Sequence, residues 1–209
     1  MYKLFSHPGW GSVLVEAQLA WYGLPYEIED VQDLFKSAAD RERLARYNPV
    51  AQLPTLICPD GRVMTESAAI TLFLADVTAR DDLVPEPGAP GRDRFLRWLI
   101  FIVANIYPTF TYADDPGRFV PGEEAQKAFR ANVDAYGRKM WSIVEAEAAS
   151  PWFLGERFSA LDIIIGAMTR WRPRRDWFAA HAPRLHAIAL GADALPQLKP
   201  VWQRNFPST

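Results

Sequence analysis

A proline- and glycine-rich segment near the middle of the chain separates two parts with different hydrophobic patterns. It reads Pro85-Glu86-Pro87-Gly88-Ala89-Pro90, and prolines at this density cannot continue a helix. Before it, strand-like and helix-like segments alternate, whereas every periodic segment after it has helical spacing. We therefore predict two domains, residues 1–77 and 91–209, joined by a linker at residues 78–90.

The first part predicts an α/β domain with the element order βαβαββα. The turn signal Pro59-Asp60-Gly61 lies between two strand-like segments and predicts a hairpin. The expected strands are residues 2–6, 26–31, 53–57 and 62–64, and the expected helices are residues 12–21, 37–47 and 66–76.

The second part predicts an all-α domain. Hydrophobic residues recur at helical spacing over residues 92–107, 123–149 and 159–171, with shorter helical segments at 176–181 and 183–191. Because an amphipathic helix must bury its apolar face, these segments are expected to pack on one another.

Composition excludes several classes of function. The net charge is -2 and no dense run of Lys or Arg occurs, so we expect neither nucleic acid nor an anionic membrane as a partner. The single cysteine, Cys58, excludes an internal disulfide, and His7, His181 and His186 lack the spacing of zinc ligands, so no metal is expected. Without a leader pattern or an apolar run of about 20 residues, a cytoplasmic protein is predicted.

A proline at the expected start of the third strand points to a ligand site. A cis Leu53-Pro54 bond would free the backbone N–H and C=O of Leu53 to pair with a peptide-like ligand. Glu66 and Ser67 follow at a helix start, where Ser67 and nearby N–H groups can receive a carboxylate and Glu66 an ammonium group. Taken alone, Ser67 is more simply a helix cap and Pro54 a loop end, but their joint spacing favours a ligand that carries a γ-glutamyl group.

The segment from Asn48 to Ile70 resembles the glutathione-site signature of cytosolic glutathione transferases, and Met1 to Glu27 resembles the opening of that family. Gly155 to Ile163 resembles its helix-capping motif, which implies that Ser159 caps a buried helix and Asp162 bonds back to the turn. The resemblance implies a thioredoxin-like first domain, glutathione as co-substrate, a detoxifying transferase activity and a homodimer. The implied glutathione-binding residues are Gln52, Leu53, Pro54, Glu66 and Ser67.

Among the classes of that family, the bacterial beta class is the most similar. Pro8 to Ser12 aligns with its first loop without a gap, but Gly11 stands where that class has its characteristic cysteine. Its polar Asn and His of the second domain appear here as Ile100 and Tyr107. Beta-type cysteine chemistry is therefore not expected.

A transferase must hold glutathione as its thiolate. Lowering a thiol pKa from roughly 9 to 6.5 requires about 3.4 kcal/mol. A hydroxyl donor supplies about 1.5–3 kcal/mol and a helix N-terminus about 0.3–1 kcal/mol. Ser12 is the first candidate donor and Ser6 the second, assisted by the backbone N–H of Gly11 or Ser12; the alternative for Ser12 is a simple N-cap. His7 and Cys58 are left out of the mechanism, as a solvated loop histidine and a buried small hydrophobe.

The apolar second substrate is expected to bind between the domains, in contact with Trp10, Tyr107, Phe110 and Tyr112, with Trp171 closing one side. Conjugation of glutathione to an apolar electrophile is the leading functional hypothesis. A glutathione-dependent reductase or isomerase, or a non-catalytic protein that binds glutathione or a hydrophobic ligand, are the alternatives. A docking module with a vestigial pocket ranks last because the glutathione motif is intact.

Overall fold

The computed structural model describes residues 1–207, and its chain forms two compact units. The first contains residues 1–84 together with the chain from Gly191 onward, and the second is Pro85–Leu190. The division falls inside the predicted linker. The chain from Gly191 onward, which the sequence pattern predicts as part of the helical domain, belongs to the first unit. No local sequence pattern predicts this placement.

The first unit contains a four-stranded sheet in the order β2-β1-β3-β4. The strands are β1 (Tyr2–Ser6), β2 (Tyr26–Asp30), β3 (Thr55–Ile57) and β4 (Val63–Met64). β1 pairs with β2 in parallel and with β3 antiparallel, and β3 pairs with β4 antiparallel. With α1 (Ser12–Tyr22), α2 (Ala38–Ala45) and α3 (Ser67–Thr78) between the strands and after them, the predicted thioredoxin-like order βαβαββα is confirmed.

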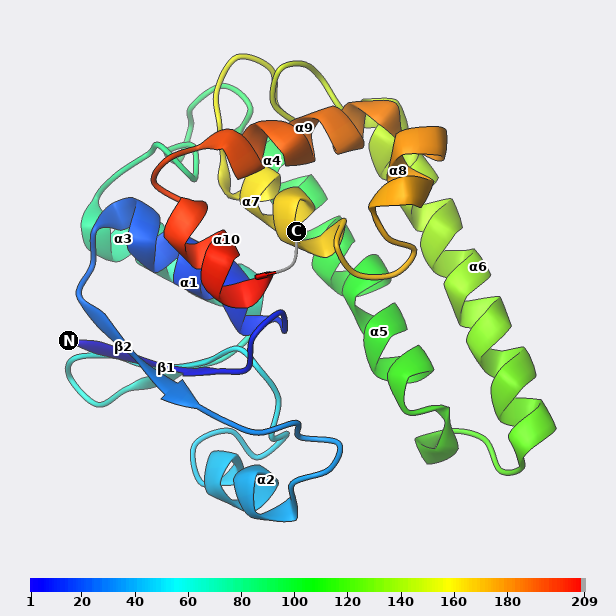
Figure 1. Ribbon diagram of the computed structural model, residues 1–209. Coiled ribbons are helices and arrows are strands. Elements are labelled where there is room, and N and C mark those ends of the chain that lie inside the picture. The colour runs from blue at the N-terminus through cyan, green and yellow to red at the C-terminus, as the bar shows by residue number, and fades with distance from the viewer. Residues whose placement is uncertain (208–209) are drawn as a thin grey trace. The chain divides into compact units, whose positions relative to one another are not determined.

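The helices of this unit cover both faces of the sheet. α1 and α3 pack together on one side, and α2 lies on the other (Figure 1). On the α2 side, Phe5 and Leu44 belong to one buried cluster, against which Trp10 packs. A helix that the sequence did not predict, α10 (Lys199–Asn205), lies beside α1 (Figure 1). α1 is thereby buried on almost all sides, which explains why its apolar residues are not confined to one face and why even Glu16 and Gln18 are buried.

The second unit is all-α, as predicted. Its elements are α4 (Arg92–Phe101), the π-helical turn η1 (Ile102–Ile106), α5 (Tyr107–Asp114), the 3₁₀ turn η2 (Pro116–Arg118), α6 (Glu123–Glu147), α7 (Ala160–Met168), α8 (Arg175–His181) and α9 (Pro183–Ala194), the last of which runs into the first unit. α5 and α6 lie side by side (Figure 1). The π-helical turn ends two residues before Pro108, which has no N–H to offer the preceding turn of an α-helix.

The buried helix α7 starts at the predicted capping motif. The Ser159 hydroxyl accepts from the N–H of Leu161 at 3.3 Å, and Asp162 Oδ2 accepts from the N–H of Ser159 at 2.7 Å. Asp162 Oδ1 also accepts from the N–H of Phe153 at 2.7 Å. The predicted cap and the bond from Asp162 back to the turn are both confirmed.

Within residues 1–207, no helix is long and apolar enough to cross a membrane. In the same part of the chain, no three His, Cys, Asp or Glu side chains are grouped closely enough to hold a metal ion.

Candidate functional site

The loop before β3 is held by a single asparagine. Asn48 Nδ2 donates to the carbonyl of Gln52 at 3.0 Å and to Thr55 Oγ1 at 3.1 Å, and its Oδ1 accepts from the N–H of Val50 at 3.1 Å. Ala51 takes a φ of +52°, which a non-glycine residue rarely adopts. The side chain of Asn48 therefore takes the place of regular backbone hydrogen bonds in this loop and fixes the conformation of the residues that lead into β3.

Leu53 presents a free backbone edge at the end of this loop. The Leu53-Pro54 peptide bond is cis, as predicted. Among residues 1–207, none bonds to the N–H or the C=O of Leu53, whereas its side chain is buried. Because Thr55 pairs with Phe5, the preceding residues lie beside the end of β1, where Ser6 stands. One donor and one acceptor are thus available to an extended ligand beside the first loop.

The start of α3 is open to an anion. Glu66, its N-cap, has a φ of +63° and an exposed side chain without a capping hydrogen bond. In the described part of the chain, neither the hydroxyl nor the N–H of Ser67 has a partner, and the first turn closes only with the N–H of Ile70 on the carbonyl of Glu66. Free donors at a helix N-terminus favour a carboxylate. The unusual backbone of Glu66 is the kind of local strain found at ligand sites.

The two serines proposed to act on the thiol form a buried pair. Ser6 Oγ and Ser12 Oγ lie 2.9 Å apart, and both side chains have zero exposed surface. Ser12 Oγ also lies 3.5 Å from the carbonyl of His7. A hydroxyl carries one hydrogen, so the Ser12 hydroxyl donates within the protein. The N–H groups of Gly11 and Ser12 have no partner among the described residues and are the free donors at this helix end.

His7 is more ordered than a solvated loop histidine. Its Nδ1 lies 2.8 Å from the carbonyl of Val31, and a carbonyl only accepts, so Nδ1 carries the hydrogen. The ring also packs edge-on against Trp10, with 4.9 Å between ring centroids. No local sequence signal indicated either contact, because both depend on the folding of the loop onto β2.

Trp10 is partly buried in the first unit. Its ring lies 5.3 Å from that of Phe35, and it packs against the buried cluster that includes Phe5 and Leu44. In the same unit, Cys58 is a buried free thiol, and burial raises its pKa, so it is poorly suited to act as a nucleophile.

Three of the aromatic residues proposed for the second substrate meet in the second unit. The rings of Tyr107, Phe110 and Trp171 contact one another edge to face, with centroid distances of 6.2, 5.8 and 5.2 Å. Tyr112 does not join them: its ring pairs with that of Phe119 at 5.2 Å. Tyr112 follows Phe110 by two positions on α5, and such positions lie on different sides of a helix.

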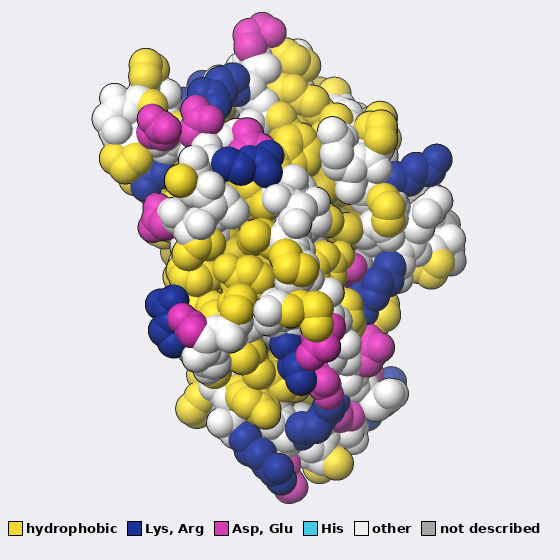
Figure 2. Space-filling view, turned by 90° about the vertical axis from the view of Figure 1, so that its left-hand side faces the viewer, with side chains coloured by type: hydrophobic (Ala, Val, Ile, Leu, Met, Phe, Trp, Pro, Cys, Tyr) yellow, Lys and Arg dark blue, Asp and Glu magenta, His cyan; other side chains and the backbone are white. Residues whose placement is uncertain are grey.

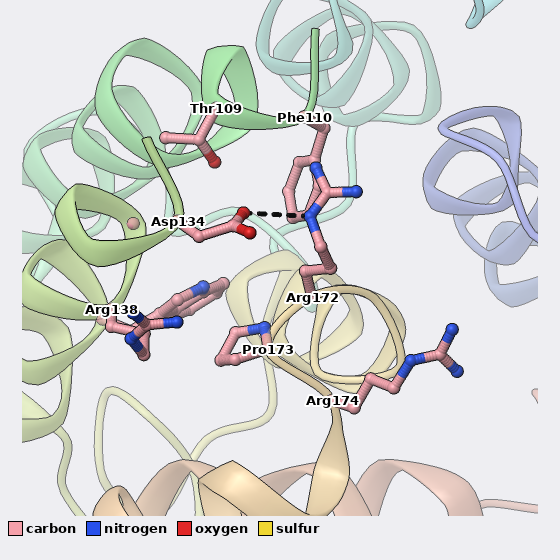
Figure 3. A pocket seen from close by; sticks show the side chains of 9 residues that line it. Thr109, Phe110, Asp134, Arg138, Arg172, Pro173 and Arg174 are labelled. Atoms are coloured by element: carbon pink, nitrogen blue, oxygen red, sulfur yellow. Dashed lines mark hydrogen bonds and ion pairs between the residues drawn. The ribbon is translucent and has the colours of Figure 1, made fainter. Parts of the chain in front are cut away.

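A cavity of about 210 Å³ lies in the second unit, and Phe110 is one of its lining residues (Figure 3). Its lining consists of Thr109, Phe110, Asp134, Gly137, Arg138, Trp141, Arg172, Pro173 and Arg174. Arg172 Nε donates to Asp134 at 3.0 Å and Nη1 to Asp114, so two carboxylates compensate its charge. Figure 3 shows the side chain of Arg174 pointing away from Arg138. The cavity therefore presents no converging set of free charges.

Comparison with known proteins places this geometry in a family. Residues 15–77 match the family model described as the N-terminal domain of glutathione S-transferase. An uncharacterized GST-like protein of Escherichia coli (strain K12), YncG, is 37% identical over 206 residues, which is 98% of either chain.

Solved structures show the same fold. A glutathione transferase homolog from Sulfitobacter with bound glutathione has a TM-score of 0.85 at 21% identity over 96% of each chain. A bacterial beta class glutathione S-transferase from Sphingomonas chungbukensis has a TM-score of 0.75 at 22% identity over 98% of each chain. Together with the near full-length sequence match, the open Leu53 edge and the α3 N-terminus, these likenesses lead to one conclusion: the chain belongs to the glutathione S-transferase family.

Proposed function

We propose that the protein is a glutathione transferase that conjugates the thiolate of glutathione to an apolar electrophile, in a detoxifying role in the cytoplasm. The observation that carries this proposal is that, among residues 1–207, the backbone of Leu53 and the N–H and hydroxyl of Ser67 at the start of α3, in the same compact unit, have no hydrogen-bond partner. A peptide backbone with a γ-glutamyl carboxylate matches these two sets of groups.

In the proposed complex, the cysteinyl backbone of glutathione pairs with the N–H and C=O of Leu53, beside Pro54. The γ-glutamyl carboxylate accepts from the hydroxyl and N–H of Ser67, and Glu66 and Gln52, whose side chains are exposed, receive the remaining polar groups. Because these donors already lack partners, binding breaks no hydrogen bond of the protein.

The sulfur is proposed to lie at the N-terminus of α1, where the N–H groups of Gly11 and Ser12 are free. A hydrogen bond to a charged group contributes about 1.5–3 kcal/mol, so two such bonds with the helix dipole supply the roughly 3.4 kcal/mol that the thiolate requires. The hydroxyls of Ser12 and Ser6 support these donors from inside the protein. A direct bond from the Ser12 hydroxyl to sulfur would first break the hydrogen bond that this hydroxyl donates within the protein.

Replacing Ser12 with alanine is expected to lower turnover about 2- to 10-fold with little change in glutathione affinity, because one buried hydrogen bond contributes about 0.5–1.5 kcal/mol. Steady-state kinetics at pH 6.5 and calorimetry measure the two quantities. Ser142→Ala is the matched control, since the Ser142 hydroxyl is exposed and bonds only to the backbone of its own helix. Unchanged turnover in Ser12→Ala would remove Ser12 from the mechanism.

For the electrophile, we propose the cluster of Tyr107, Phe110 and Trp171 in the second unit. Edge-to-face aromatic rings offer a rigid apolar surface to a flat or hydrophobic substrate. Tyr112, which packs on Phe119, is assigned no substrate contact in this proposal.

A non-catalytic glutathione carrier is the second candidate, favoured by the burial of both serine hydroxyls and by Gly11 in place of a loop cysteine. Calorimetry with glutathione, the thiolate absorbance of the bound tripeptide from pH 5 to 9 and an assay with a generic electrophile separate the two. Binding with a depressed thiol pKa and conjugation supports the transferase. Binding with an ordinary thiol pKa and no turnover supports the carrier, and absence of binding contradicts both.

A homodimer is also proposed. Hydrophobic side chains (yellow) are exposed between charged groups on the face drawn in Figure 2. Large exposed hydrophobic residues of the described chain include Val63, Val77, Ile100 and Tyr136. Exposed hydrophobic side chains are available for burial between subunits. Sedimentation velocity at micromolar concentration tests the proposal, and a monomer there would contradict it.

A further inference from the structure

The end of the chain contacts the loop that precedes α1. Asn205 Oδ1 accepts from the N–H of Gly9 at 3.2 Å. Asn205 Nδ2 donates to Glu16 Oε2 and to the carbonyl of Val201, both at 2.9 Å. The two bonds of Nδ2 fix the orientation of the side-chain amide, so its oxygen is held toward Gly9.

Gly9 and α10 approach each other closely. The φ of Gly9 is +75°, and a Cβ atom added there would lie 3.3 Å from the carbonyl oxygen of Asn205 and 3.5 Å from the ring of Phe206. A side chain at this position would meet both an unfavourable backbone conformation and a crowded neighbour. The loop conformation and the position of α10 therefore depend on each other.

Arg204 reaches the serine pair from the same helix. Its Nη1 donates to Glu16 Oε2 at 2.8 Å and to Ser6 Oγ at 3.3 Å, and its Nη2 donates to Asp30 Oδ1 at 3.0 Å. Since Ser6 Oγ accepts from Arg204, its own hydrogen is free to bond Ser12 Oγ, 2.9 Å away. Ser12 can then donate to the carbonyl of His7 at 3.5 Å. These contacts connect the Arg204 guanidinium, through the hydroxyls of Ser6 and Ser12, to the backbone of the first loop.

The buried carboxylate of Glu16 requires the contact between α10 and α1. Glu16 is only 2% exposed on α1, and its side-chain partners, Arg204 and Asn205, both come from α10. Burial raises the pKa of Glu16, and the hydrogen bonds from Asn205 and Arg204 oppose that shift. A buried carboxylate without partners is strongly unfavourable, so the folded unit requires α10 to be docked.

We propose that Arg204 and Asn205 are positioning residues of the glutathione site. They hold residues 6–12 in the conformation that aims the N–H groups of Gly11 and Ser12 at the sulfur. This inference rests on the proposed function, because it concerns the thiolate of bound glutathione. Donors that stabilise a charge must be fixed to within about half an ångström, so loosening the loop weakens thiolate stabilisation before it weakens binding of the rest of the tripeptide.

The test compares Asn205→Ala and Arg204→Lys with the wild-type full-length protein. Arg204→Lys keeps the charge but cannot reach Glu16, Ser6 and Asp30 together. Arg80→Gln is the matched control: Arg80 pairs with Asp82 in the same unit and touches none of residues 6–12. Calorimetry gives the Kd for glutathione, ultraviolet absorbance the pKa of its bound thiol, and amide hydrogen exchange without glutathione the protection of Gly9.

Both variants should raise the pKa of the bound thiol by about 0.5–1 unit and lower kcat at pH 6.5 about 2- to 6-fold, because the thiolate fraction at that pH falls as the pKa rises above about 6.5. At pH 6.5, the Kd for glutathione should stay within about twofold, since Leu53 and Ser67 are untouched and ionisation of the thiol contributes little to affinity at a pH near its own pKa. Asn205→Ala should also speed exchange of the Gly9 amide about tenfold or more, because a broken hydrogen bond exposes it to local opening. Arg80→Gln should change none of these quantities. If Asn205→Ala does not fold, Arg204→Lys gives the thiol pKa and kcat on its own.

Two failures are distinguishable. If wild type binds glutathione with a depressed thiol pKa and both variants keep that pKa and kcat, the inference is overturned and the proposed function stands. Unchanged exchange of the Gly9 amide in Asn205→Ala overturns the inference in the same way. If wild type binds no glutathione, the proposed function fails and the inference falls with it.

Discussion

Replacing Asp162 with alanine is expected to lower the free energy of unfolding by about 3–5 kcal/mol, because each buried donor left without a partner costs about 1–3 kcal/mol. The carboxylate is fully buried and accepts from the N–H of Phe153, the N–H of Ser159 and the Ser159 hydroxyl. Alanine would leave all three donors unpaired at the start of α7, a helix whose residues are all buried. The loss therefore affects the helix that the second unit packs around.

Urea unfolding of the full chain, followed by circular dichroism, measures this effect at pH 7.5. Ser159→Ala should be milder, at about 1 kcal/mol, because it removes the cap hydroxyl and leaves the carboxylate in place. Asp60→Ala is the control: Asp60 closes an exposed turn with Arg62, and such surface changes stay within about 0.5 kcal/mol. A loss below 1 kcal/mol for Asp162→Ala would show that water or a shifted backbone replaces the carboxylate.

The penalty of Asp162→Ala should depend on pH with a definite sign. Burial raises the pKa of Asp162 from 3.8 to about 6. A carboxyl group with a raised pKa in the folded state binds its proton more tightly there than in the unfolded chain. Its contribution to the free energy of unfolding is therefore full below the unfolded pKa and is lost as pH rises through 6. Between pH 7.5 and pH 5, the difference between wild type and variant should grow by about 1 kcal/mol. A difference that shrinks over this interval would contradict the raised pKa.

Replacing Ser67 with alanine is expected to weaken glutathione binding by about 1.5–3 kcal/mol, or roughly 10- to 150-fold in Kd, because a hydrogen bond to a charged carboxylate is lost. The hydroxyl has no partner among the described residues, so removing it leaves no protein donor unsatisfied. The loss should therefore appear in the binding of glutathione, and the stability of the free protein should change little.

Calorimetry on the two proteins tests this expectation. Thr78→Ala is the matched control, since Thr78 lies at the opposite end of the same helix and its hydroxyl bonds the carbonyl of Leu74. Its Kd should stay within about twofold of wild type, as expected for a distant site. A Kd within twofold for Ser67→Ala as well would place the γ-glutamyl carboxylate elsewhere.

Much of the fold followed from local pattern. Strand alternation, the turn at Pro59-Asp60-Gly61 and the helical spacing after Pro90 depend on residues a few positions apart, and the order βαβαββα and the all-α second part were predicted from them. The capping motif at Ser159 and Asp162 is local in the same sense. The position of Pro54 at the start of a strand predicted the cis peptide bond and the availability of the Leu53 backbone.

The site itself was predicted only in part, because neighbours that are distant in sequence decide which donors are free. Ser6 and Ser12 were proposed as thiol donors, yet folding brings their hydroxyls together and buries them. The loop position of His7 predicts a solvated side chain, but its Nδ1 bonds the carbonyl of Val31, which fixes the ring. Sequence proximity predicts that Tyr112 contacts the second substrate beside Phe110, but the ring of Tyr112 packs against that of Phe119.

The sequence by itself determined the order of elements, the resemblance of residues 48–70 to a glutathione-site motif and the cap of α7, since each depends on residues that are close together in the chain. Only the tertiary structure decided that α10 docks on α1 and brings Asn205 to Gly9 and Arg204 to Ser6. Nearly the whole length of the chain separates those partners, so no periodicity relates them. Their pairing is set by the burial of Glu16, whose carboxylate obtains its hydrogen bonds only when both ends of the chain are folded together.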